Sequence, residues 1–466
     1  MSIQQNIKIT FLGGVGTVTG SKYLIEISKH KLLIDCGLFQ GLKDLRLLNW
    51  QHLPFDVTTL DCVLLTHGHL DHVGYLPALV KQGFKGSIYA TQPTIEISKL
   101  ILLDSARIQE EDAHKANLYN YSKHKPAKPL YTVKDAENVF PLFQVKPTNE
   151  WTKLFPEVKF KFQYNGHIIG ACSIELSVYD KIIVFSGDIG RENDPLMFAP
   201  EKPKEADILF LESTYGNRFH TENPEQILAN IINANVSKNG TIIIPSFAVE
   251  RTQLVMYYLW KLKSKKVIPN LPVYIDSPMG TGVTDIFRNN LLWHKLSITD
   301  CDKMCSHIKI IKKAEETNQV IKNKVSKIII AGSGMASGGR VLTYFEHYLN
   351  DPNATILLVG YQGEGTRGRA LLEGEKEIKM HGKYWPVKAK VALVEGLSAH
   401  ADQKELVNWL SDLKKQPEKI FITHGDKESS ETLKVKINDA LGYNSDIPKL
   451  NEKYNCMINL KQKTIE

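Results

Sequence analysis

The stretch Thr66-His67-Gly68-His69-Leu70-Asp71-His72 decides the fold of this chain. It places three imidazoles and one carboxylate, which are ligand types that suit zinc, in six consecutive residues. The apolar run 61–65 before it is typical of a buried strand, and residues 73–80 after it have the pattern of a helix. These side chains are therefore expected at the carboxyl end of a strand, where open α/β sheets place their sites.

The spacing inside this stretch predicts two groups of metal ligands. In an extended segment, side chains two residues apart point the same way, so His67 and His69 can bind one ion. Asp71 and His72 lie where the chain enters the helix, and they can bind a second ion. The alternative is a polar loop with accidental histidines, and four ligand-type side chains this close together argue against it.

The bulk composition is that of a folded protein with a large core. The chain has 466 residues, of which 42% are hydrophobic and 23% charged. At about 150 residues per domain, this length predicts two or three domains. The net charge of +7 and the sequence pI near 8.8 are a mild basic excess, which permits a polyanionic partner but does not require one.

Cysteine usage and hydropathy indicate where the protein works. The six cysteines form no C-x-x-C pair, so we expect buried free thiols. The first residues lack a basic segment followed by an apolar core, and no apolar run approaches the ~18 residues of a membrane span. We therefore predict no signal peptide, no membrane partner and a cytoplasmic location.

Three further side chains with useful chemistry stand at the ends of predicted strands, each near a glycine. A carboxylate at Asp35 suits a partner that orients a metal-bound histidine, and a turn-forming aspartate is the alternative. His167 follows the alternating strand 158–164 and is as compatible with a structural histidine as with a ligand. Asp188 follows the strand 181–185, and a carboxylate there can bridge two cations, one on each oxygen.

A separate α/β pattern occupies the middle of the chain. Strands and helices alternate between residues 241 and 359, which predicts a small parallel sheet. Segment 332–340 follows a strand and opens a helix, so its backbone amides can hold a phosphate, although a purely structural turn fits equally well. The lysine-rich stretch 309–327 can follow a nucleic-acid backbone or serve as a solvated face.

Several motifs together resemble the metallo-β-lactamase fold and, more narrowly, the β-CASP nucleases. The broader resemblance rests on the H-x-H-x-D-H cluster, the G-H pair ending at His167 and the S-G-D triplet ending at Asp188. The narrower one rests on Glu212-Ser213-Thr214-Tyr215-Gly216, Leu397-Ser398-Ala399-His400-Ala401-Asp402 and Thr423-His424-Gly425-Asp426. It covers residue 7 to about residue 430. The resemblance implies an α/β fold, a metallo-β-lactamase αββα sandwich with an inserted β-CASP α/β domain.

The resemblance also implies the domain order and the place of the reaction. Residues 1–210 are the predicted first part of the metallo-β-lactamase domain, 211–368 the inserted β-CASP domain, and 369–466 the second part. The reaction is expected in the cleft between the two domains.

By the same resemblance, the predicted site holds two Zn²⁺ ions per chain. A water between them loses a proton, and the hydroxide attacks a phosphodiester. The bridging ligand is Asp188. The predicted ligands of one ion are His67, His69 and His167, and those of the other are Asp71, His72 and His400.

Further residues receive roles from the resemblance. The predicted catalytic residues are Asp71, Glu212 and His424, with Glu212 orienting or polarising groups near the leaving oxygen. The predicted substrate-binding residues are Ser337, Gly339, Arg340 and Arg369.

One signature departs from the family. Active β-CASP ribonucleases carry a histidine soon after an E-G-T triplet, where it is thought to protonate the leaving oxygen. Here Glu364-Gly365-Thr366 is followed by Arg367-Gly368-Arg369-Ala370, which contains no histidine. Arginine does not release its proton near neutral pH, so Arg369 is expected to neutralise a phosphate instead. His424 or a metal-bound water is then the expected proton donor.

The predicted function is hydrolysis of RNA phosphodiester bonds by a zinc-dependent ribonuclease. It is expected to be an endonuclease, similar to the pre-mRNA 3′-end processing subunit and its bacterial and archaeal relatives. His400 favours single-stranded RNA over DNA, because the DNA-cutting relatives carry a valine at that motif. The alternatives are a non-catalytic RNA-binding paralogue and a small ester or thioester hydrolase of the superfamily. The complete ligand set weighs against the first and the large insertion against the second, while a homodimer is left open.

Overall fold

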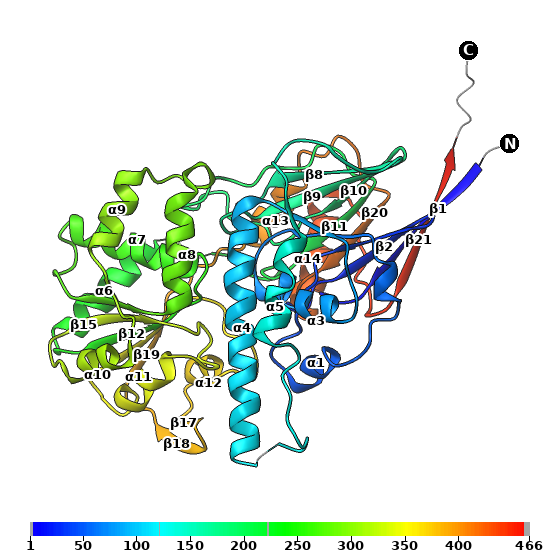
Figure 1. Ribbon diagram of the computed structural model, residues 1–466. Coiled ribbons are helices and arrows are strands. Elements are labelled where there is room, and N and C mark those ends of the chain that lie inside the picture. Colours follow the sequence, from blue (N-terminus) through cyan, green and yellow to red (C-terminus); the bar gives the residue numbers. More distant parts are fainter. Residues whose placement is uncertain (1–2, 121, 221–222, 461–466) are drawn as a thin grey trace. The chain divides into compact units, whose positions relative to one another are not determined.

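The computed structural model describes residues 3–120, 122–220 and 223–460 (Figure 1). Their contacts divide the chain into two compact units. The first unit comprises residues 1–192, 199–219 and 400–466, and the second comprises residues 193–198 and 220–399. Within the described residues, no helix combines the length and the apolar composition needed to cross a lipid bilayer.

The first unit is built on two sheets. One sheet has seven strands, in the spatial order β21 (Lys453–Leu460), β1 (Ile3–Phe11), β2 (Tyr23–Ile27), β3 (His30–Ile34), β4 (Cys62–Leu64), β5 (Ser87–Ala90) and β6 (Phe143–Val145). The other has six, in the order β20 (Lys419–Thr423), β11 (Ile208–Glu212), β10 (Lys181–Phe185), β9 (Cys172–Val178), β8 (Val158–Tyr164) and β7 (Thr152–Phe155).

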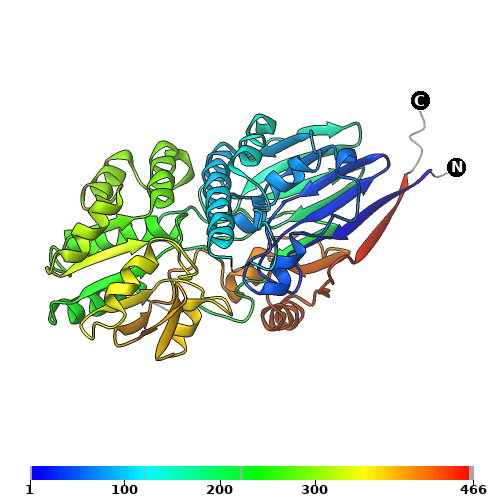
Figure 2. The same cartoon turned by 60° about the horizontal axis from the view of Figure 1, so that its bottom comes forward.

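The two sheets lie face to face (Figure 2), and aromatic side chains from both pack against one another. Phe210 of β11 has its ring centroid 5.5 Å from that of Phe11 on β1 and 4.4 Å from that of Phe185 on β10. Tyr23 of β2 lies 5.2 Å from Phe210, and Phe421 of β20 lies 4.9 Å from Phe11. Each such ring contributes roughly 1.5–3 kcal/mol on burial, so this layer is a main source of the unit's stability.

Helices cover the outer faces of both sheets. Helices α13 (Gln403–Trp409) and α14 (Lys427–Leu441) pack Leu406, Trp409 and Leu433 against Val184 and Leu209 of the second sheet. The first sheet is accompanied by helices from the first third of the chain, among them α3 (Leu76–Lys81), α4 (Gln92–Leu118) and α5 (Val133–Glu137). The first unit therefore has the four layers expected of an αββα sandwich.

Strand direction gathers the polar motifs at one end of this sandwich. Strands β3 and β4 are parallel neighbours, and so are β10, β11 and β20. Asp35, the segment from His67 to His72, Asp188, Glu212 and His424 each follow or end one of these strands. Because parallel strands share their carboxyl edge, residues more than 350 positions apart in the chain are brought to the same place.

The second unit has a six-stranded sheet in which every pairing is parallel, as the alternating pattern predicts. Its spatial order is β14 (Lys309–Ile310), β13 (Val273–Asp276), β15 (Lys327–Ala331), β12 (Thr241–Pro245), β16 (Thr355–Leu358) and β19 (Lys390–Leu393). The apolar run of β15 is buried along its whole length, as in other parallel strands with both faces covered.

The second unit extends beyond the predicted end of the insertion. Its last sheet strand is β19, so the unit runs on to Ala399 and includes the hairpin of β17 (Glu377–Met380) and β18 (Lys383–Pro386). The predicted domain boundaries at residues 210 and 368 stay a prediction.

Candidate metal centre

The motif turn after β4 is held from two sides by backbone hydrogen bonds. The helix α2 (Leu70–Val73) begins inside the motif, and its carbonyls at Asp71 and His72 accept from the amides of Ser21 and Cys36 at 2.9 and 2.7 Å. A Cβ at Gly68 would lie 2.7 Å from a methyl carbon of Ile97, so only glycine fits there without displacement. The ligand side chains are thus fixed by a rigid backbone.

A first group of ligand atoms comes from His67, His69, His167 and Asp188, which lie within 4.8 Å of one another. Nδ1 of His69 lies 3.1 Å from Nε2 of His67 and 3.2 Å from Nε2 of His167. Oδ2 of Asp188 lies 3.4 Å from the same His67 nitrogen. The structure therefore brings together all four residues predicted for the first ion.

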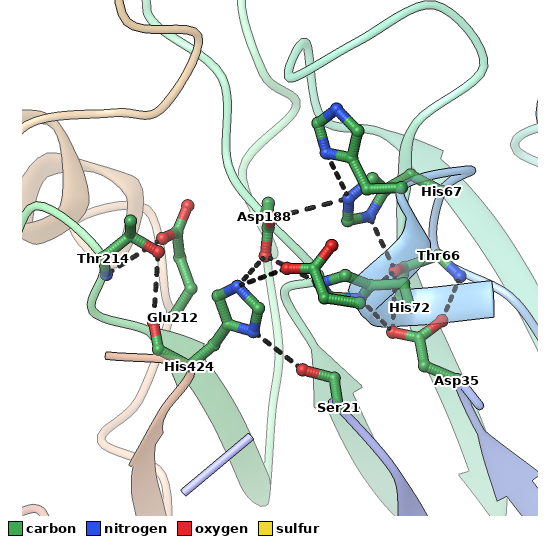
Figure 3. A network of polar contacts seen from close by, with 12 residues as sticks. Ser21, Asp35, Thr66, His67, His72, Asp188, Glu212, Thr214 and His424 are labelled. Carbon is green, nitrogen blue, oxygen red and sulfur yellow. Dashed lines mark hydrogen bonds and ion pairs between the residues drawn. The ribbon is translucent and has the colours of Figure 1, made fainter. Parts of the chain in front are cut away.

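A second group comes from Asp71, His72 and His424. Nε2 of His424 lies 3.6 Å from Oδ2 of Asp71 and 3.5 Å from Oδ1 of Asp188. Nε2 of His72 lies 3.3 Å from that same Oδ1 (Figure 3). One oxygen of Asp188 faces the first group and the other faces the second, which is the arrangement a bridging carboxylate needs.

The structure places His400 outside both groups, so its predicted role as a ligand of the second ion stays a prediction. His400 belongs to neither group, because its backbone pairs with Gly190 and its ring lies against that of His167, with centroids 4.5 Å apart. Its Nδ1 lies 3.4 Å from Oε1 of Glu212. His424 takes its place beside Asp71 and His72, since the end of β20 reaches the motif loop.

Three side chains hold the imidazoles in position. Asp35, predicted as an orienting partner, lies with Oδ2 2.8 Å from Nδ1 of His72, and it accepts 2.8 Å hydrogen bonds from the amide and the hydroxyl of Thr66. The hydroxyl of Ser21 lies 2.7 Å from Nδ1 of His424. Sequence reasoning missed Ser21 and Thr66; Thr66 opens the motif, whereas no local pattern marks Ser21.

The glycine-rich turn at residues 13–16, before β2, brings backbone to the site. The carbonyl of Gly14 accepts from the amide of His424 at 2.6 Å. Gly14 has a φ of +64°, and a Cβ there would lie 2.6 Å from the hydroxyl oxygen of Ser21. Glycine at this turn therefore leaves room for the hydroxyl that contacts His424.

Burial keeps most of these imidazoles neutral. It lowers the pKa of His67 and of His167 well below the ordinary value, and that of His424 to about 3. Burial acts the same way on His72, but the carboxylates of Asp188 and Asp35 outweigh it and raise the pKa of His72. A neutral imidazole offers its lone pair, so His67, His167 and His424 are in the state that a metal requires.

Two buried atoms are suited to a cation. Nε2 of His72 and Oδ1 of Asp188 lie 3.3 Å apart, but neither makes a hydrogen bond among the described residues. Such atoms normally pair, because leaving a buried polar group unsatisfied costs about 1–3 kcal/mol. A divalent ion bound by nitrogen and oxygen donors would satisfy both.

Glu212, predicted as catalytic, lies buried beside His400 instead of among the ligand atoms. Its Oε1 accepts from the amide of Ile189 at 2.6 Å, and its Oε2 accepts from the amide of Thr214 at 3.2 Å. With both oxygens held in this way, Glu212 is placed to orient the ring of His400. Tyr215 completes the surroundings, with its ring stacked on that of His400 at 5.8 Å.

The predicted substrate-binding residues all lie in the second unit. Ser337 and Gly339 are exposed on the loop that follows β15. Arg340 forms an ion pair with the buried Asp276, and Arg369 forms one with Glu373 at 2.6 Å. Both guanidinium groups therefore already have a carboxylate partner.

Comparison with protein-family models finds three matches along the chain. Residues 15–217 match the metallo-β-lactamase superfamily, and residues 252–371 match the β-CASP domain. Residues 384–448 match the Zn-dependent metallo-hydrolase RNA specificity domain. These matches confirm the predicted fold class.

Curated relatives align with nearly the whole chain. The chain is 30% identical to ribonuclease TTHA0252 of Thermus thermophilus, over 91% of this chain and 94% of that protein. It is also 30% identical to an RNase J-like protein of Methanocaldococcus jannaschii, with the same coverage of 91% and 94%. The transcription termination factor FttA of Methanosarcina mazei is 30% identical over 92% of this chain, but the match spans only 68% of that factor.

A solved structure supports the fold alone. A crystal structure of a protein of unknown function from Enterococcus faecalis superposes with a TM-score of 0.53 at 13% identity. The match covers 97% of this chain and 100% of that one.

Replacing Asp35 with asparagine should weaken metal binding without unfolding the protein. Asp35→Asn keeps the size of the side chain but removes the charge that holds His72, and loss of such a partner typically lowers metal affinity about 10- to 100-fold. The measurement is competition of the protein with a chromophoric chelator for Zn²⁺. Asp56→Asn is the matched control, since Asp56 caps a surface turn through the amide of Thr58 at 3.0 Å. Equal affinity of Asp35→Asn and wild type would show that Asp35 serves only the fold.

Proposed function

The chain belongs to the β-CASP family of the metallo-β-lactamase superfamily, and from that premise we propose that it is a zinc-dependent ribonuclease. The observation that carries the proposal is the meeting of two ligand groups at Asp188, with one carboxylate oxygen toward each. A site of this kind suits hydrolysis of a phosphodiester, in which the attacking oxygen brings negative charge and the leaving oxygen gains it.

We assign two zinc ions to the two groups. One would be held by His67, His69, His167 and Asp188, and the other by Asp71, His72, His424 and Asp188. Bound there, the ions supply Lewis-acid chemistry that lowers the pKa of water and stabilises charge on phosphate oxygens. The nitrogen and carboxylate donors, without a thiolate among them, are a set that zinc accepts.

The proton for the leaving oxygen is assigned to His400. The sequence predicts His424 or a metal-bound water for this role, but the two ring nitrogens of His424 face Ser21 and the carboxylates of Asp71 and Asp188. His400 stands outside both ligand groups, and its Nδ1 is directed at the buried Glu212. Glu212 stabilises the protonated ring and fixes its orientation, and the ring of His400 donates its proton to the departing 3′-oxygen. The pair of His400 and Glu212 thereby supplies the general acid that is missing after the E-G-T triplet.

Single-stranded RNA is the proposed substrate. The relatives described as ribonucleases, the match to an RNA specificity domain and the net charge of +7 all support it. His400 stands at the motif position where DNA-cutting relatives carry valine. We also propose that the enzyme cleaves RNA internally, as an endonuclease.

Metal content is the first measurement. Protein purified without chelator is expected to contain about two zinc ions per chain by elemental analysis, because seven ligands converge among the described residues. His69→Ala should reduce this ratio while the far-ultraviolet circular dichroism stays unchanged. A ratio near zero in the wild type, with no zinc taken up on reconstitution, would contradict the two-metal assignment.

The activity is tested with zinc-loaded protein and end-labelled single-stranded RNA and DNA of one sequence. Internal cleavage of the RNA, much slower cleavage of the DNA and loss of cleavage in His69→Ala are the expected results. His307→Ala, at an exposed histidine of the second unit, is the control and should cut at the wild-type rate. RNA that is bound tightly but never cut would favour a non-catalytic RNA-binding protein.

Leaving-group dependence tests the role of His400. General acid catalysis is typically worth ~10²–10⁴-fold, so His400→Ala should slow RNA cleavage by about that factor. A nitrophenyl phosphodiester, whose leaving group needs no proton, should lose far less. Zinc content must stay at the wild-type ratio, because the variant removes no assigned ligand. An equal loss of rate on both substrates, together with loss of one zinc ion, would show that His400 is a metal ligand.

A further inference from the structure

A second pocket lies in the first unit, away from the ligand groups. It has a volume of about 90 Å³ and is lined by residues that come before β2, from the segment around α1 (Lys43–Leu48), and from the turn before β21. Its buried floor is formed by Lys22, Phe39 and Tyr75, whereas His52 and Leu450 on its rim are exposed. The pocket therefore opens to solvent above a buried lysine.

The ammonium group of Lys22 has an unusual environment for a lysine. The residue is only 3% exposed, and its Nζ donates a 2.6 Å hydrogen bond to the carbonyl of Gly37. Nζ also lies 4.5 Å from the ring centroid of Phe39 and 5.3 Å from that of Tyr75. One carbonyl and two ring faces contact the cation, and two of its three N–H bonds remain for other acceptors.

No negative charge balances Lys22 within the described residues. No carboxylate lies at ion-pair distance from Nζ there, although buried lysines are seldom found without one. The thiol of Cys36 interacts electrostatically with Lys22, but burial raises its pKa to about 12, so it stays neutral. Burial also lowers the pKa of Lys22 to about 8, which leaves the amine mostly protonated at neutral pH.

We propose that this pocket binds a small organic acid, with its carboxylate on Lys22 and a short apolar chain against the pocket walls. The walls supply apolar surface through Leu12, Leu48 and Leu53. A mainly apolar pocket with one buried polar anchor is the common form of a small-molecule site. The volume of about 90 Å³ fits a ligand of a few carbon atoms.

A purely structural lysine does not account for these features. Holding the Gly37 carbonyl takes one N–H bond and no charge, so a neutral donor would do the same without the cost of burying a cation. The carboxylate of a ligand supplies the missing charge and accepts the remaining N–H bonds. The proposal is independent of the ribonuclease assignment, since no ligand-group residue lines the pocket.

Calorimetric titration of the zinc-loaded full chain with butyrate tests the proposal. Butyrate should bind, and its neutral isostere butyramide should bind at least about 10-fold more weakly, because a hydrogen bond to a charged group is lost. Lys22→Met, which keeps the length and apolar character of the side chain, should weaken butyrate binding by a similar factor. Lys29→Met is the matched control at an exposed lysine of the β2–β3 turn. Equal binding of butyrate and butyramide, tighter binding of inorganic phosphate, or no binding at all would each overturn the proposal.

Proton uptake on wild-type protein gives a test that needs no folded Lys22 variant. A carboxylate stabilises the protonated amine, so butyrate binding at pH 8 should take up a fraction of a proton, read from titrations in buffers of different ionisation enthalpy. Affinity should be constant below about pH 7 and fall as the pH rises through 8, where free Lys22 loses its proton. The other ionisable groups are Tyr75 and His52 in the pocket lining and Cys36 near Lys22, and the same uptake in His52→Gln excludes the histidine. Binding without proton uptake would contradict the role of Lys22.

Discussion

The buried carboxylate of Asp188 is the constraint on which the first unit depends. It is 1% exposed and lies within 3.6 Å of nitrogens from four histidines, which come from three separate regions of the chain. Burial alone would favour the protonated acid, but the imidazoles of His424, His72 and His67 hold the pKa of Asp188 well below its usual range. A charge in this setting is tolerated only with well-placed partners, so the strand ends that carry those partners must converge.

Glycines make that convergence possible where two backbones touch. A Cβ at Gly37 would lie 1.5 Å from the carbonyl oxygen of Asp71, and one at Gly190 would lie 2.1 Å from the carbonyl carbon of Gly166. The first contact sets the strand end of Asp35 against the motif loop, and the second sets the Asp188 turn against the His167 turn. These glycines allow the loops to pack closely, and this packing positions the ligand side chains.

The features that could be predicted from the sequence are those whose interacting residues are close together in the chain. The H-x-H-x-D-H cluster, the strand-end position of Asp188 and the parallel sheet of the second unit are local patterns, and the structure contains them. His400 and His424 are a different case. Each lies inside a family-like motif, and no neighbouring residue in the sequence indicates which of the two imidazoles lies beside Asp71. That choice is made by the pairing of β20 with β11, more than 200 residues away in sequence, and by the contact of His424 with Ser21. Ser21 was missed for the same reason, since its partner is 403 residues distant.

The second unit shows the same limit for charged residues. Arginines on a glycine-rich loop suggest phosphate contacts, yet Arg340 is the counter-ion of Asp276, which is 0% exposed and also accepts 2.6 and 2.7 Å hydrogen bonds from Thr317 and Tyr344. Removing that guanidinium would leave a buried carboxylate without its cation, which costs stability before it affects any ligand. A loss of RNA binding in an Arg340 variant is therefore ambiguous by itself. The backbone amide of Ser337 already donates to the hydroxyl of Ser333 at 3.1 Å, so the amide of the exposed Gly339 is the sounder place to look for a phosphate contact.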